Sequence, residues 1–224
     1  NKLNASSTEI INAMLGDGSS MTKSTARKIK NEAINIVTLE DPVEYKMDGV
    51  NQIQVNVDAG LTFASGLRSI LRQDPDIIMI GEIRDNETAE IAVKASITGH
   101  LVVSTLHTNS SASTITRLED MGIEPYLIAD SVVGVIAQRL VRRLCPKCKR
   151  SRLADAVDLE TLGMQQGREA VIYEPGGCHM CNNTGYYGRI GVYEIMEVTP
   201  KLKEIISKHG NADEINKVAM SQGM

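Results

Sequence analysis

Short apolar runs alternate with amphipathic segments through the middle of the chain. Residues 34–39 are rich in β-branched side chains and end in an acidic turn with a proline, which predicts a strand. Residues 77–80 are apolar at every position, as is typical of a strand buried on both faces of a parallel sheet. Residues 101–106 form a similar run. We therefore predict three strands here.

The segments between these strands have helical spacing. Residues 62–73 place Phe63, Leu67, Ile70 and Leu71 on one face, and residues 86–98 and 111–121 show comparable patterns. Strands and helices in alternation indicate an α/β layered domain with a parallel sheet.

The ends of the chain are less regular. Residues 129–144 are predicted to be helical, and residues 200–224 to form a polar, peripheral helical bundle. Residues 1–33 contain Ser/Thr-rich patches and a basic segment, with no strand before Gly16. We predict four parts: a poorly matched segment over 1–33, an α/β core over 34–144, a cysteine module over 145–195 and a C-terminal helical subdomain over 196–224.

Polar residues follow each predicted strand, and ligands of parallel sheets bind at the carboxyl ends of strands. Such positions hold Glu40, Asp41, Glu82, His107 and Thr108, which we expect to converge. The run from Ile77 to Glu82 matches the pattern in which P-loop NTPases place a carboxylate beside Mg²⁺ and the attacking water. A solvated glutamate at a strand end is the alternative. The acids of residues 40–44 and the nearby His107 favour the first interpretation.

Composition narrows the class of protein. Hydrophobic residues make up 42% and charged residues 23%, as in soluble globular domains, while aromatic residues are only 3%, so the core must be aliphatic. The net charge of −4 gives no reason to expect nucleic-acid binding. No apolar run is long enough to span a bilayer and no signal-peptide pattern opens the chain, which predicts a cytosolic location.

Four cysteines form two CxxC pairs, Cys145 with Cys148 and Cys178 with Cys181. This spacing suits four thiolates around Zn²⁺ in a closed structural site, whose role is in folding. Two disulfides are the alternative, which the predicted cytosolic location disfavours. His179 lies inside the second pair as a possible substitute ligand, but four cysteines complete the set without it.

Four sequence boxes now carry a specific resemblance. The chain resembles the GspE/PilB secretion-ATPase family in order from about residue 34 to its C-terminus. Residues 38–45 (TLEDPVEY) are similar to the Asp box, 80–85 (IGEIRD) to the Walker B box, and 98–108 (TGHLVVSTLHT) to the His box. The cysteine pairs with residues 185–194 (GYYGRIGVYE) resemble the zinc-bearing domain of the assembly branch.

The resemblance implies a RecA-like P-loop NTPase core that hydrolyses ATP with Mg²⁺. It also implies a homohexamer at the cytoplasmic face of the inner membrane, driving a platform protein in type IV pilus assembly or type II secretion and associating with the membrane through its partners. Glu82 corresponds to the Walker B acid, and His107 to a residue near the γ-phosphate. Asp-box acids are Glu40, Asp41 and Glu44, and further candidate nucleotide contacts are Arg84 and His100.

The phosphate-binding loop departs from the family pattern. Lys23 and Ser24 are the candidate residues, but Asp17 and Thr22 occupy the two glycine positions. Either parts of a longer protein are missing from the chain, as the other intact boxes favour, or this is a hydrolysis-dead docking subunit. A basic cluster around the first cysteine pair (Arg139, Arg142, Arg143, Lys147, Lys149, Arg150 and Arg152) suits a phosphate or lipid contact, and without interleaved aromatic residues it does not favour nucleic acid.

Overall fold

The structure is a computed structural model that describes residues 34–165 and 167–224. The predicted phosphate loop with Lys23 and Ser24 lies outside the described residues. Packing divides the chain into two compact units. The larger unit combines Asn1–Ala137 with Tyr193–Met224, and the smaller unit is Gln138–Val192.

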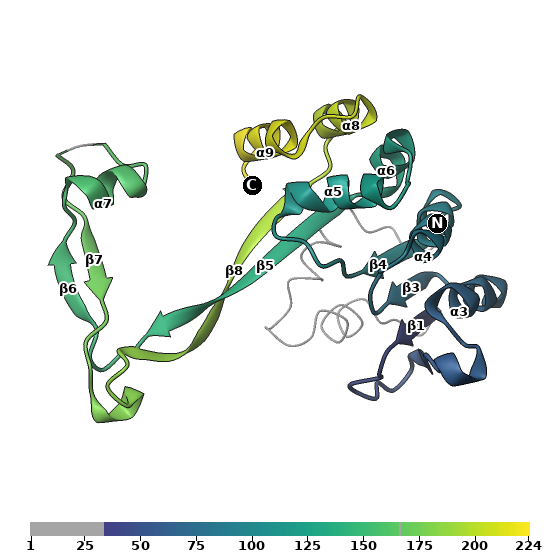
Figure 1. Cartoon of the computed structure of the whole chain (residues 1–224), viewed down its shortest axis with the longest axis horizontal. Helices are drawn as coiled ribbons and strands as arrows, with labels where there is room; N and C mark the ends of the chain where they lie inside the picture. The colour runs from purple at the N-terminus through teal and green to yellow at the C-terminus, as the bar shows by residue number, and fades with distance from the viewer. Residues whose placement is uncertain (1–33, 166) are drawn as a thin grey trace. The chain divides into compact units, whose positions relative to one another are not determined.

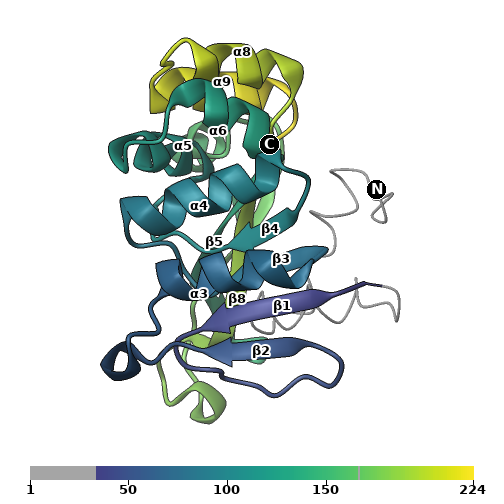
Figure 2. The same cartoon turned by 90° about the vertical axis from the view of Figure 1, so that its right-hand side faces the viewer.

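A four-stranded parallel sheet organises the larger unit (Figure 1). Its strands are β1 (Ile36–Glu40), β2 (Asn51–Gln54), β3 (Ile77–Ile80) and β4 (Leu101–Ser104), in the order β2-β1-β3-β4 (Figure 2). The register pairs Leu39 with Ile80, and Ile80 with Ser104. The parallel sheet predicted from the sequence is therefore confirmed, and its carboxyl ends share one edge.

Three predicted helices are also confirmed: α3 (Phe63–Ile70), α4 (Asn86–Ile97) and α5 (Ser111–Asp120). Short 3-10 turns precede and extend α3 at Val57–Ala59 and Leu71–Gln73. Each α-helix begins at a capping side chain, from Thr62, Asp85 or Ser110, that accepts a hydrogen bond from a first-turn N–H. These caps explain why the helices start directly after polar turns.

The core between the sheet and its helices is aliphatic, as the scarcity of aromatic residues predicts. Val37 and Leu39 of β1 and Ile78 of β3 are fully buried in one cluster with Leu67 of α3. A Cβ on Gly66 would lie 2.9 Å from Leu39 Cδ1, so α3 approaches the sheet closely where glycine leaves room. The sheet that carries the strand-end residues is thus held tightly from this side.

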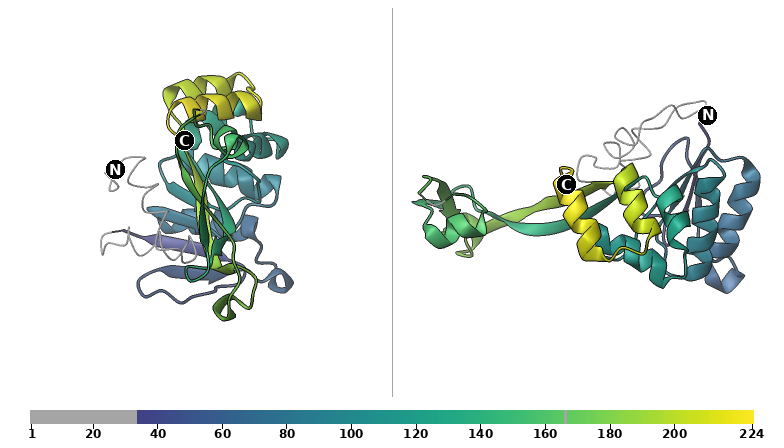
Figure 3. Two further views of the ribbon diagram at one scale, coloured as in Figure 1. Left: turned by 90° about the vertical axis from the view of Figure 1, so that its left-hand side faces the viewer. Right: turned by 90° about the horizontal axis from the view of Figure 1, so that it is seen from above.

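The C-terminal helices share this core. Helices α8 (Pro200–Ser207) and α9 (Ala212–Ser221) pack against α6 (Pro125–Ser131) and α5, respectively (Figure 3). Leu202, Ile206 and Ile215 are fully buried in the main cluster. The prediction of helices is correct, but they are part of the larger unit's core and not a peripheral bundle.

The helix predicted over residues 129–144 is wrong. Helix α6 ends at Ser131, and residues Gly134–Leu144 form strand β5, which pairs with β8 (Tyr186–Glu197). β-Branched residues at 132, 133, 135 and 136 favour an extended backbone. The pairing partner lies about 50 residues later in the chain, beyond the reach of a local pattern.

In the smaller unit, β6 (Arg150–Leu153) and β7 (Val171–Glu174) form an antiparallel pair beside α7 (Ala156–Thr161). Arg152 forms ion pairs with Asp158 of α7 and Glu174 of β7, which ties the helix to the strands. A 3-10 turn at His179–Cys181 holds the second cysteine pair. Across the part of the chain that the structure describes, every helix is too short or too polar to cross a membrane.

Candidate functional site

Glu82 lies two residues beyond the last residue of β3, at the carboxyl edge of the sheet. The backbone before it is fixed on two sides: Gly81 N–H donates to Leu39 O at 2.8 Å, and Thr105 Oγ1 donates to Gly81 O at 2.7 Å. A Cβ at position 81 would lie 3.3 Å from Leu39 O, so glycine permits this close approach. The two neighbouring strands therefore determine where Glu82 points.

The Glu82 carboxylate has a positive or polar partner on each oxygen. Arg84 Nη2 lies 2.6 Å from Oε1, and His107 Nε2 lies 3.2 Å from Oε2. The Glu82 side chain is only 12% exposed, whereas those of Arg84 and His107 are 67% and 84% exposed. The hydrogen bond from Arg84 is the main influence that lowers the pKa of Glu82, against the opposing effect of its burial. Glu82 is therefore a carboxylate throughout the neutral range.

Glu40 belongs to the same edge but is held by the scaffold. It is 8% exposed, and its Oε1 accepts hydrogen bonds from Thr38 Oγ1 at 2.5 Å and Gln52 Nε2 at 3.0 Å. Gln52 also donates to Tyr45 O, which links β2 to the loop after β1. In this arrangement Glu40 organises the loop that follows it.

Asp41 and Glu44 are exposed on that loop. Glu82 foremost, and Asp41 to a smaller extent, raise the pKa of Arg84. Of the residues expected to converge, Glu82 and His107 are in contact, and Asp41 is close enough to influence Arg84, which was not in the expected set. No hydrogen bond or ion pair of Glu44 is seen within the described residues.

His100 is not brought to this group. It precedes β4, at the amino edge of the parallel sheet, with the whole strand between it and His107. Its Nδ1 lies 3.0 Å from Ala95 O and 3.3 Å from Thr98 Oγ1, at the C-terminal end of α4. The His100 side chain therefore contacts the C-terminal end of α4 and not the group around Glu82.

Sequence reasoning missed Glu194, which helps to hold the loop carrying His107. The Glu194 carboxylate accepts a hydrogen bond from Ser111 N at 2.8 Å, at the first residue of α5. Thr108 and Thr114 hydroxyls lie 2.8 Å apart and join that helix to the loop. Glu194 is 83 residues away from Ser111 in the chain, so no local pattern indicates the contact.

Replacing Arg84 by glutamine should raise the pKa of Glu82, because the strongest influence lowering it is removed. If hydrolysis requires ionised Glu82, the acidic limb of the pH–rate profile should move to higher pH. The stabilising contribution of the Glu82 carboxylate is present above its ordinary pKa and lost as pH falls through the folded-state value, so the variant should lose stability near neutral pH and approach the parent in acid. We would measure kcat/KM and unfolding from acidic to neutral pH; an unmoved acidic limb would contradict this role.

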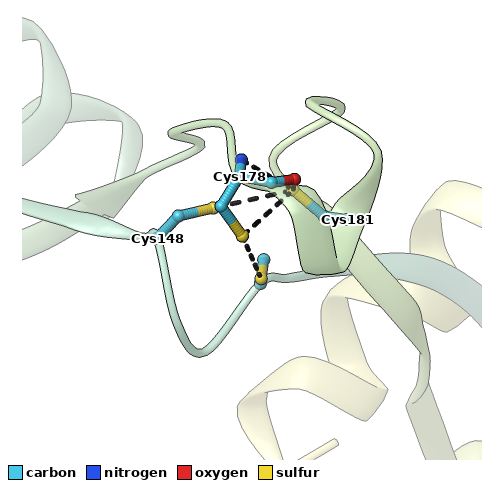
Figure 4. A group of neighbouring side chains, drawn as sticks. Cys148, Cys178 and Cys181 are labelled. Carbon is cyan, nitrogen blue, oxygen red and sulfur yellow. Dashed lines mark hydrogen bonds between the residues drawn. The ribbon is translucent and has the colours of Figure 1, made fainter.

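The four cysteines converge in the smaller unit. Figure 4 shows Cys148, Cys178 and Cys181 of this group. Their sulfur atoms all lie within 4.8 Å of one another, with Sγ–Sγ distances of 3.8 Å for Cys145–Cys178, 3.7 Å for Cys148–Cys181 and 3.8 Å for Cys178–Cys181. A tetrahedron with zinc–sulfur bonds of about 2.3 Å has edges of about 3.8 Å. A disulfide requires about 2.05 Å. The spacing therefore fits a tetrahedral metal site and excludes disulfides in this arrangement.

The surroundings of the cysteines also fit a metal site. Burial raises the pKa of Cys181, but N–H donors from Cys178 and Gly185 act against it and bring the value to about 6. Burial and the neighbouring thiols raise the pKa of Cys148 to about 12. Four thiolates this close therefore need a cation between them. A Cβ on Gly176 would lie 2.1 Å from Cys148 O, so glycine lets the two CxxC turns approach.

Residues 10–223 match the model of a family described as "Type II/IV secretion system protein". The chain belongs to this family. It is 52% identical over 219 residues to the type IV pilus assembly ATPase PilB of Acinetobacter baylyi, covering 96% of this chain and 38% of that protein. It is 51% identical over 189 residues to the type II secretion system protein E of Pseudomonas aeruginosa, covering 84% of this chain and 38% of that protein.

A crystal structure of the pilus retraction motor PilT with bound ADP has the same fold, with a TM-score of 0.64 and 28% identity over 92% of this chain and 50% of that one. The predicted RecA-like P-loop NTPase fold is thus confirmed. The chain spans about two fifths of the length of these two curated relatives.

Proposed function

We propose that this chain forms the ATP-hydrolysing part of a motor that powers type IV pilus assembly or type II protein secretion. The observation that carries the proposal is the Glu82 carboxylate, held between Arg84 and His107 at the carboxyl edge of the sheet. Relatives at about half identity are a pilus assembly ATPase and a type II secretion protein E, and this supports the assignment.

In this proposal the substrate is ATP, and Glu82 acts on the water that attacks the γ-phosphate. A carboxylate with a lowered pKa is a weak proton acceptor near neutrality, so in the state described Glu82 is better suited to orient the water than to deprotonate it. Release of Arg84 from Glu82 would make the acid a stronger base. His107 is exposed beside Glu82 and suits contact with the phosphate group undergoing transfer.

Mg²⁺ is the expected metal cofactor, and it would neutralise the charge that develops on the phosphate oxygens. Asp41 and Glu44 are exposed at the same edge. Among the described residues they have no scaffold hydrogen bond like those on Glu40, which suits them to the hydrated cation. Glu82 already has a partner on each oxygen. We assign the phosphate contacts to Lys23 and Ser24 together with Arg84.

Zn²⁺ would be held by the four cysteines, with a structural role because four thiolates leave no open position. The cysteine pairs resemble the assembly branch of the family, so we assign the motor to extension or secretion and not to retraction. We further propose that six copies form a ring at the cytoplasmic face of the inner membrane. That ring would move a platform protein, without nucleic acid as a partner.

The alternative is a subunit that docks but does not hydrolyse ATP, which the unusual loop at residues 17–24 favours. Both functions predict zinc and folding, so nucleotide measurements separate them. With the whole protein, Mg-ATP at about 100 times its Kd should increase the unfolding free energy by about 2.7 kcal/mol. Phosphate release in the same samples supports the motor. Stabilisation without phosphate release supports the docking subunit, and the absence of both contradicts a nucleotide site.

A further inference from the structure

We infer that Glu194 is a positioning residue for ATP hydrolysis, acting on His107 through the first turn of α5. This inference rests on the proposed function. The Glu194 carboxylate does not contact Glu82, Arg84 or His107. It can affect these residues only through the backbone that connects Ser111 to His107.

The contact is specific and sheltered. Glu194 Oε2 lies 2.8 Å from Ser111 N, and Ser111 itself is fully buried. The first N–H groups of a helix have no partner inside the helix and carry partial positive charge, so a carboxylate there is stabilising. Ser110 caps the same turn by accepting from Ser113 N, which leaves the Ser111 N–H to Glu194. The two acceptors together fix the start of α5.

A short chain of contacts leads from that turn to the catalytic group. Thr114 of α5 donates to Ser110 O, and its hydroxyl lies 2.8 Å from the Thr108 hydroxyl. Thr108 directly follows His107, whose Nε2 is 3.2 Å from Glu82. Because the His107 side chain is 84% exposed, its position depends on its contact with Glu82 and on the backbone that carries it. Glu194 is the distant side chain that holds this backbone.

Loss of the carboxylate need not unfold the strand. Ser111 Oγ also donates to the main-chain oxygen of Glu194 at 3.3 Å, and this contact does not depend on the residue type. Met196 of β8 and Val198 just after it are buried in the core and anchor the same segment. A Glu194→Ala variant should therefore fold, with a less constrained start of α5. Glu194→Gln keeps an oxygen acceptor of the same shape.

The test compares Glu194→Ala, Glu194→Gln and the control Glu197→Ala in the whole protein. Glu197 lies on the same strand and is exposed. We expect Glu194→Ala to lower kcat about ten-fold while KM for Mg-ATP changes less than about two-fold, because a displaced group affects the transition state more than substrate binding. Glu194→Gln should restore most of the rate. Amide hydrogen exchange over residues 107–113 should speed up in Glu194→Ala alone.

Two results would overturn the inference: unchanged exchange and rate in Glu194→Ala, or the same fractional loss of rate when Glu194→Ala is added to His107→Ala. Residues acting through one another should instead be non-additive, so the second change should have little further effect. The proposed function fails in a different way, when neither the parent nor any variant hydrolyses ATP. Amide exchange still decides the positioning role in that case.

Discussion

Glu82→Gln should reduce Mg-dependent ATP hydrolysis by at least about 100-fold, the scale of losing a positioned acid or base. Glutamine has the same shape but no charge, so the ion pair with Arg84 disappears and, in the proposed mechanism, the attacking water loses its anionic acceptor. KM for ATP should change little, because Glu82 is not assigned to nucleotide binding. The measurement is steady-state phosphate release by the whole protein over a range of Mg-ATP concentrations.

The matched control is Glu87→Gln. Glu87 of α4 forms an ion pair with Arg68 at 2.6 Å, the same distance as in the Glu82–Arg84 pair, but both side chains are more than half exposed. Exposed pairs contribute little to stability, so this variant should retain full activity and fold. Equal loss in both variants would point to damaged folding or assembly, and full activity of Glu82→Gln would remove Glu82 from the mechanism.

The carboxyl edge of the sheet could be predicted because its signals are local. A completely apolar run such as residues 77–80 indicates a buried strand, and parallel strands place their following residues at a common edge. This reasoning predicts that Glu82 and His107 lie together, and the 3.2 Å contact agrees with it. The cysteine cluster was predictable for the same reason, since CxxC spacing fixes each pair locally.

What sequence reasoning missed depends on contacts between distant segments. Residues 134–144 are predicted as part of a helix but form strand β5. Their partner β8 begins about 50 residues later, so no local pattern indicates the pairing. The resemblance makes His100 a candidate nucleotide contact, and strand β4 separates it from His107 at the opposite edge of the sheet. The contact of Glu194 with Ser111 spans 83 residues. Long-range pairing leaves no periodic signal in a single sequence.

Removal of zinc should unfold the smaller unit around the cysteines. Apart from the parts of β5 and β8 that lie in it, its described elements are the β6–β7 pair, one short helix and a 3-10 turn. Many of its large apolar side chains are exposed, including Leu153, Val157, Val171 and Tyr173. So little buried apolar surface cannot offset the chain entropy of folding, and the metal must supply the difference. Structural zinc sites contribute roughly 10 to 16 kcal/mol in small peptides at neutral pH.

We would compare the Cys145→Ser variant with its matched control, His179→Ala. The comparison distinguishes a zinc ligand from a nearby residue that does not bind zinc. Cys145 is fully buried within the cluster, whereas His179 is exposed and lies outside the group of four. We expect zinc near one per chain in the parent and in His179→Ala, and much less in Cys145→Ser. Proteolysis between residues 145 and 185 should become rapid in Cys145→Ser and in chelator-treated parent. If the zinc-free forms are cleaved at the parent's rate, the fold of this unit does not need the metal. If His179→Ala loses zinc, His179 is a ligand.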